Sequence, residues 1–109
     1  MTVEALANTL SLSPLFVSDA TREVHGAYIG DLLSWVMGRA KADCAWITIM
    51  TNINVCAVAS LSDVACVILA ENVEPDPPML QAAEMRGINL YRSEKTAYEL
   101  AALLAAQGI

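Results

Sequence analysis

The polar residues best placed for chemistry in this sequence lie within and just after the largely apolar run at residues 45–50; they are Thr48, Thr51, Asn52 and Asn54. Where a strand passes into a helix, the first backbone N–H groups of the helix have no partners within it and can bind a phosphate or a carboxylate. Short Asn and Thr side chains can add hydrogen bonds to the same anion. Capping needs only one Asn, so we expect these residues to form an anion-binding loop, with plain capping as the alternative.

A second group of residues precedes a predicted helix at 31–39. Gly26 and Gly30 have GxxxG spacing, and a glycine-rich entry to a helix is one way to build an anion site. A turn followed by a helix start explains this spacing at least as well. We interpret Asp31 as a helix cap and Tyr28 as either a ligand contact or a core aromatic. The sequence thus predicts a ligand pocket between residues 26–31 and 48–54.

Catalytic groups are not apparent in the sequence. None of the five glycines precedes a Lys-Ser or Lys-Thr pair, so the phosphate-binding loop of nucleotide-dependent kinases is absent. His25 is the only histidine, and the cysteines at 44, 56 and 66 lie among apolar residues without a CxxC pair. We predict reduced, buried cysteines and a protein that is not an enzyme, with no catalytic residue, no metal and no cofactor.

The composition bears on partners and location. The 109 residues fit one domain, and the net charge of −6 argues against binding to nucleic acid. The N-terminal segment does not resemble a secretory signal and the most apolar tract is broken by polar residues, so we expect a cytoplasmic protein with no membrane contact. Hydrophobic residues make up 56% and charged residues 17%, which favours a homodimer interface over an Ala-rich core with an ordinary surface. Trp35 is an interface candidate, and Trp46 belongs to the core or an interface.

Hydrophobic periodicity and capping signals define the expected elements. We expect helices at 2–10, 31–39, from 52 or 54 to about 61, 77–86 and 93–106, and strands at 15–17, 45–50, 65–70 and 88–91, with an extended piece at 22–27. The expected caps are Thr2, Asp31, one of the two Asn, Asp76 before Pro77, and Ser93, and Gly87 is expected to end a helix. The apolar face of the second helix is expected to consist of Leu32, Leu33, Val36 and Met37.

From residue 45 onward strands and helices alternate, which predicts an α/β domain with a mainly parallel sheet. Ligands of such open sheets bind beyond the carboxyl ends of the strands. Those ends are expected at residues 48–54, 70–72 and 91–93.

Residues 25–34 (HGAYIGDLLS), 45–54 (AWITIMTNIN) and 57–61 (AVASL), with the helix start at Glu74-Pro75-Asp76, resemble the DRTGG domain family over nearly the whole chain. The sequence departs from the family motif, since Ala27 follows Gly26 and no Asp-Arg pair directly precedes them. The resemblance implies a single domain over 1–109 with a three-layer fold like the MurF / HPr kinase N-terminal domain fold.

In larger proteins, including some phosphate acetyltransferases and pyrophosphatases, such domains look regulatory or dimerising. The resemblance and the strand-end loops together predict a non-catalytic regulatory module, a homodimer that binds a small anionic or nucleotide-like ligand. The expected ligand residues are Gly26, Tyr28, Gly30, Asp31, Thr48, Thr51, Asn52 and Asn54. The alternative is a protein-interaction subunit of a larger enzyme complex, for example a redox complex, with no ligand of its own.

Overall fold

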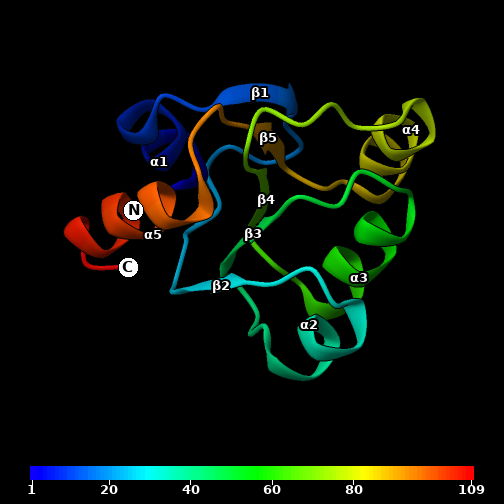
Figure 1. Cartoon of the computed structure of the whole chain (residues 1–109), viewed down its shortest axis with the longest axis horizontal. Helices are drawn as coiled ribbons and strands as arrows, with labels where there is room; N and C mark the ends of the chain where they lie inside the picture. The colour runs from blue at the N-terminus through cyan, green and yellow to red at the C-terminus, as the bar shows by residue number, and fades with distance from the viewer.

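A computed structural model describes all residues, 1–109, and has at its centre a five-stranded sheet in the order β1-β5-β4-β3-β2 (Figure 1). Strands β2 to β5 are parallel, and β1 pairs with β5 in the antiparallel direction. The bounds are β1 Ser13–Phe16, β2 Ala27–Ile29, β3 Ala45–Thr48, β4 Cys66–Leu69 and β5 Leu90–Arg92. The predicted mainly parallel α/β sheet is confirmed.

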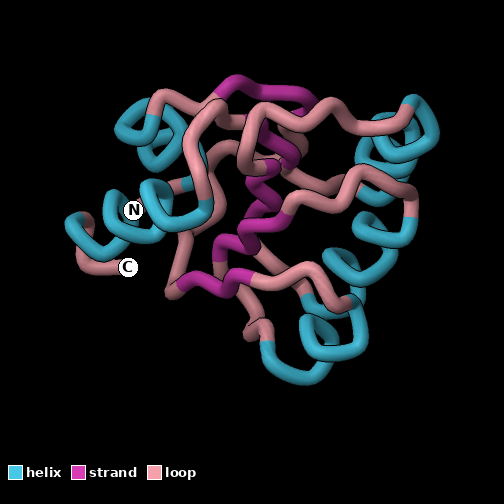
Figure 2. Tube along the Cα trace, in the orientation of Figure 1, coloured by secondary structure: helices cyan, strands magenta, loops and turns pink.

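Helices cover both faces of the sheet, which gives the three layers seen in Figure 2. Their bounds are α1 Val3–Leu10, α2 Leu33–Arg39, α3 Asn54–Ser62, α4 Pro77–Arg86 and α5 Ala97–Ala106. The first and last helices pack on one face, and α2, α3 and α4 pack on the other (Figure 1). The longest helices have ten residues, and none is long and apolar enough to cross a membrane.

The two cores follow from the period of two along each strand. Neighbouring residues of a strand point to opposite faces, so Ile47 joins the core under α1 and α5 while Trp46 joins the core under the other three helices. All residues of β3 and β4 are buried, as expected of parallel strands covered on both sides. The predicted strand at 45–50 ends earlier, at Thr48, because the Met50 N–H donates back to the Thr48 hydroxyl at 3.3 Å.

Two helix ends have the predicted caps. The Thr2 side chain accepts a hydrogen bond from the Ala5 N–H at the start of α1, and Gly87 ends α4 in a left-handed conformation with φ of 67°. Pro77 occupies the first position of α4 as predicted, and Asp76 is the N-cap residue, but its side chain makes no capping hydrogen bond. The α4 start therefore depends on its prolines, whose fixed φ suits a first helical turn.

Three other predicted caps are wrong. Helix α5 is capped by Thr96 and Glu99 in a reciprocal capping box, and the Ser93 hydroxyl instead accepts from the Lys95 N–H. Helix α2 starts at Leu33, with no side-chain cap, since Asp31 points elsewhere. At α3 the Asn52 side chain accepts from the Asn54 N–H in an Asx turn and stands outside the helix.

The predicted apolar face of α2 is also largely wrong. Only Val36 is buried, Leu33 is half-buried, and Leu32 and Met37 are 56% and 51% exposed. Helix α2 has only seven residues and lies beside β2, a short strand at the sheet edge. It therefore has too little neighbouring structure to cover all four apolar side chains.

Candidate functional site

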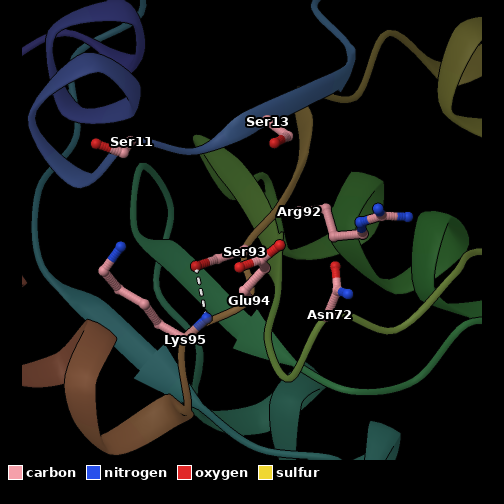
Figure 3. A pocket seen from close by; sticks show the side chains of 7 residues that line it. All are labelled: Ser11, Ser13, Asn72, Arg92, Ser93, Glu94 and Lys95. Carbon is pink, nitrogen blue, oxygen red and sulfur yellow. Dashed lines mark hydrogen bonds between the residues drawn. The ribbon is translucent and has the colours of Figure 1, made fainter.

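The largest cavity of the molecule, about 330 Å³, lies at the carboxyl ends of β4 and β5. The helix that follows β4 packs on one face of the sheet, and the helix that follows β5 packs on the other. The two loops therefore leave neighbouring strands in opposite directions, which opens a crevice where ligands of open α/β sheets bind. We name this space the switch-point cavity, and Figure 3 shows the side chains around it.

The walls of the switch-point cavity are entirely polar. Three segments that are remote in sequence supply them: the end of α1 with the start of β1, the loop after β4, and the end of β5. The lining residues are Ser11, Ser13, Asn72, Arg92, Ser93, Glu94 and Lys95. Because β1 runs antiparallel to β5, Ser13 lies opposite Arg92 and so reaches the carboxyl edge of the parallel strands. Hydroxyl, amide, guanidinium and ammonium donors thus surround one space.

Two cationic side chains, Arg92 and Lys95, and one carboxylate, that of Glu94, line the switch-point cavity, so its lining has a net positive charge. The Lys95 ammonium forms no ion pair, and its nearest partner is the Leu10 carbonyl at 3.5 Å. The Arg92 guanidinium pairs with Glu74, whose carboxylate is 79% exposed and therefore weakly held. Ser93 is 95% buried by its neighbours, and its oxygen accepts from the Lys95 N–H at 3.0 Å, as Figure 3 shows. Its hydroxyl proton has no acceptor in the protein and is free to bind a ligand oxygen.

Backbone hydrogen bonds brace the two loops that form the cavity. The Asn72 N–H donates to the Ser93 carbonyl at 2.8 Å, and the Glu71 N–H donates to the Lys95 carbonyl at 2.9 Å. Ser11, Glu71 and Asn72 all have φ between 54° and 62°, a region that non-glycine residues seldom adopt. Main-chain bonds therefore hold the two loops together, and they do not use the side chains that line the cavity.

Three of the sequence-predicted ligand residues lie together at the ends of β2 and β3. The Asp31 carboxylate accepts from the Thr48 hydroxyl at 2.7 Å and from the Ile49 N–H at 2.9 Å. Thr48 is buried, and the Gly30 carbonyl accepts from the Trp46 indole at 3.0 Å. A Cβ on residue 30 would lie 2.8 Å from the Tyr28 ring, so Gly30 is needed for close packing. These groups join two strand ends and have a structural role.

The loop that follows lies on the surface. Asn52 and Asn54 are exposed, and Thr51 is half-buried with its carbonyl accepting from the Asp76 N–H at 2.9 Å. The first N–H groups of α3 are already bonded within the chain, at Asn54, Val55 and Cys56. The free donors expected from the sequence at this helix start are therefore not there. None of the three cavities is lined by residues 48–54.

Gly26 lies apart from the other predicted residues. It precedes β2, at the amino ends of the strands, whereas Thr48 lies at the carboxyl end of β3. The expected pocket between residues 26–31 and 48–54 is therefore wrong as a single space. Gly26 and Tyr28 instead line a separate cavity of about 280 Å³ at the amino ends of the strands, together with His25, Ala27, Arg39, Lys41 and Cys44.

The cysteines are all free and buried, as the sequence predicted. Burial raises the pKa of each thiol, to about 12 for Cys66, so these side chains are protonated and unreactive near neutral pH. No group of three His, Cys, Asp or Glu side chains is arranged to hold a metal ion.

Comparison with solved structures shows which known fold this is. The chain superposes, with a TM-score of 0.78 over 94% of its length, on part of a structure that contains the CBS and DRTGG domains of the regulatory region of a Clostridium perfringens pyrophosphatase, solved with the activator diadenosine tetraphosphate. The identity is 10%, and the chain spans 45% of that structure. The likeness confirms the predicted DRTGG-like fold. No family model and no curated protein matches the chain.

Part of the switch-point cavity could be predicted from the sequence. The strand ends at 70–72 and 91–93 were predicted, and Asn72, Arg92 and Ser93 lie in or directly beside them. Ser11 and Ser13 had no such signal, because their place depends on the antiparallel pairing of β1 with β5. Lys95 was expected inside the helix capped by Ser93, whereas the N-cap of α5 lies three residues later, at Thr96, and leaves Lys95 in the loop.

Proposed function

We propose that this chain is a non-catalytic regulatory module that binds a small anionic ligand, such as a nucleotide or an acyl phosphate, in the switch-point cavity. The observation that carries the proposal is a cavity lined only by polar residues, with two cationic side chains against one carboxylate, at a strand-end crevice of a parallel sheet. Its volume falls in the range of small-molecule sites, about 300–1,000 Å³, and the other two cavities are smaller.

Charge and donor placement support an anion with several oxygens. Lys95 and Arg92 lie on different sides of the cavity, with Ser93 and the Glu94 carboxylate between them (Figure 3), and Ser93 offers a hydroxyl proton there. Hydrogen bonds between charged groups and phosphate oxygens are roughly twice as strong as neutral ones. The structural neighbour also belongs to a regulatory region, solved with a nucleotide activator. From this neighbour we take for the proposal only that the domain is regulatory and responds to a ligand.

Calorimetric titration of the chain with pyrophosphate, ADP and acetyl phosphate tests the proposal. We expect at least one of them to bind, and Arg92→Gln and Lys95→Gln each to weaken binding about tenfold, as loss of a charged hydrogen bond predicts. Glu74→Gln should tighten binding, because it releases Arg92 from its ion pair. Arg86→Gln, which removes an exposed charge on α4, is the matched control and should leave the affinity unchanged.

Failure of all three compounds to bind, or equal affinity in Arg92→Gln, Lys95→Gln and Arg86→Gln, would contradict the proposal. If Asn52→Ala and Asn54→Ala weaken binding while Arg92→Gln does not, the ligand binds at the loop after β3. That result would restore the site predicted from the sequence.

We also propose that the module is a homodimer. Six large apolar side chains are between 46% and 56% exposed. Five of them lie at the end of β2 or within six residues after the end of β2 or β3: Ile29, Leu32, Trp35, Ile49 and Ile53. We name them the β2–β3 end face. Monomeric proteins seldom expose large contiguous apolar patches. Strand β2 is also an unpaired sheet edge, which a second copy can cover.

A protein partner from a larger enzyme complex is the alternative occupant of the β2–β3 end face. It would leave the isolated chain monomeric, so the oligomeric state separates the two possibilities.

A further inference from the structure

A second cavity of about 220 Å³, with chemistry unlike that of the switch-point cavity, lies between α1 and the segment that follows it. The side chains of Ala7, Leu12 and Val17 contribute to its apolar walls, and five of its eight lining residues are hydrophobic. The segment Ser11–Pro14 separates the two spaces: its serines line the polar cavity, while Leu12 and Pro14 line this one. We name the second space the α1 cavity.

The α1 cavity contains one negative charge and no positive one. Glu4 and Asn8 are one helical turn apart on α1, so both stand on the helix face that lines the cavity. Glu4 forms no salt bridge, and no Lys, Arg or His contributes to the lining. A carboxylate without a counter-charge beside an apolar wall attracts a cation that carries an apolar body.

The second independent observation is the Tyr91 hydroxyl. Tyr91 is 97% buried and lines the α1 cavity, yet its hydroxyl makes no hydrogen bond to the protein. Buried hydroxyl groups are nearly always paired with the protein, with water or with a ligand. The Tyr91 hydroxyl oxygen is not fully enclosed by the protein. It therefore opens into the cavity that Tyr91 lines. Burial and the Glu4 charge raise the pKa of Tyr91, so the hydroxyl is neutral and can accept from an N–H group.

We propose that the α1 cavity binds a small apolar amine, whose ammonium group lies between the Glu4 carboxylate and the Tyr91 hydroxyl and whose hydrocarbon body packs on Leu12 and Val17. This site is separate from the anion site of the proposed function and has the opposite charge preference. Each site can therefore be tested without the other.

Benzylamine, benzyl alcohol and benzoate are suitable probes, because they share one ring and differ in charge. Titration of ¹⁵N-labelled chain should show benzylamine shifting the amide signals of Ala7 and Leu12, benzyl alcohol binding more weakly, and benzoate causing no shift there. Glu4→Gln should weaken benzylamine binding about tenfold, and Tyr91→Phe several-fold, as loss of a charged and a neutral hydrogen bond predicts.

Two control variants show whether losing a hydroxyl or a carboxylate outside the α1 cavity changes benzylamine binding. Tyr98→Phe removes a hydroxyl that is on an 83% exposed residue of α5, and Glu84→Gln removes an exposed carboxylate of α4. Both should bind benzylamine like the unmodified chain. Tyr91→Phe removes only an unpaired hydroxyl and should fold normally, which a thermal melt checks. Equal binding of the three probes, or benzylamine binding unchanged in both Glu4→Gln and Tyr91→Phe, would overturn the proposal.

Discussion

At the scale of single residues, Asn89 fixes the N-terminal segment to the sheet. Its side chain is 96% buried and makes four hydrogen bonds: its oxygen accepts from the N–H groups of Ser18 and Asp19, and its nitrogen donates to the carbonyls of Asp19 and Ala65. These four bonds use both acceptor sites of the amide oxygen and both N–H groups of the amide nitrogen. No sequence pattern identified Asn89, because three of its four bonds reach residues about seventy positions away and the fourth reaches Ala65, 24 positions away.

We therefore predict that Asn89→Asp destabilises the protein by about 3 kcal/mol or more. The carboxylate cannot donate to either carbonyl, and it places a charge in a buried site. Urea denaturation measures the loss. Asn54→Asp is the control, since it makes the same change on the surface at the start of α3 and should alter stability by no more than about 0.5 kcal/mol. Equal losses in the two variants would contradict this role.

Cys66 makes stability depend on pH in the alkaline range. Its thiol pKa is about 12 in the folded protein against 9.0 for an ordinary thiol, because burial disfavours the thiolate. Below about pH 9 both states are protonated and the contribution is constant. Above that pH the unfolded chain loses its proton first, so stability falls, by roughly 1 kcal/mol at about pH 10.

Denaturation curves at about pH 7 and pH 10 test this for the unmodified chain and for Cys66→Ala. The variant should lose less stability between the two pH values, although its stability at pH 7 is lower because a cavity is created. An identical pH-dependent loss in both proteins would show that other groups, such as Tyr91, account for the effect.

At the scale of elements, the sequence predicted every helix and four of the five strands, whereas β2 at Ala27–Ile29 was expected only as an extended piece at 22–27. It failed at boundaries that depend on contacts distant in sequence. Asp31 has the features of a cap, but in the structure it bonds to Thr48 across two strands. Tertiary hydrogen bonds of this kind compete with local capping and cannot be inferred from spacing alone.

The end of α4 provides an element-scale prediction. Gly87 has φ of 67°, and a Cβ there would lie 3.1 Å from the Ser18 hydroxyl oxygen. Gly87→Ala should therefore destabilise the protein by about 1–2 kcal/mol. Gly38→Ala is the contrast: Gly38 is within α2, with nothing within 4 Å of the added methyl group, and should gain about 0.5–1 kcal/mol. Thermal melts distinguish these outcomes, and a loss in both variants would contradict the interpretation.

At the scale of the whole molecule, the apolar surplus in the composition has a structural counterpart in the β2–β3 end face. We predict a dimer by light scattering at micromolar concentration. Leu32→Lys and Ile49→Lys should each produce a monomer that stays folded, because both side chains are already about half exposed. Met85→Lys, at an 86% exposed position on α4, should remain dimeric. If the unmodified chain is a monomer, the homodimer proposal is contradicted and the protein-partner alternative is favoured.

The position of the candidate site is also a property of the whole molecule. Sequence alone indicated that strand ends would bind a ligand, and it favoured the loop after β3 because its Thr and Asn residues are conspicuous. The crevice is instead between β4 and β5, because only there do the following helices pack on opposite faces. That arrangement depends on α5 crossing to the face of α1, which helical periodicity does not reveal.

The most direct test is to map pyrophosphate on ¹⁵N-labelled protein by its effect on amide signals. If the ligand occupies the switch-point cavity, the amides of Asn72, Ser93, Glu94 and Lys95 shift together in a saturable way, and Lys95→Gln weakens the response. The amides of Gly26 and Asn52 stay in place. Saturable shifts at Asn52 and Asn54 with none at Ser93 and Lys95, or no saturable shift anywhere, would contradict an anion site between β4 and β5.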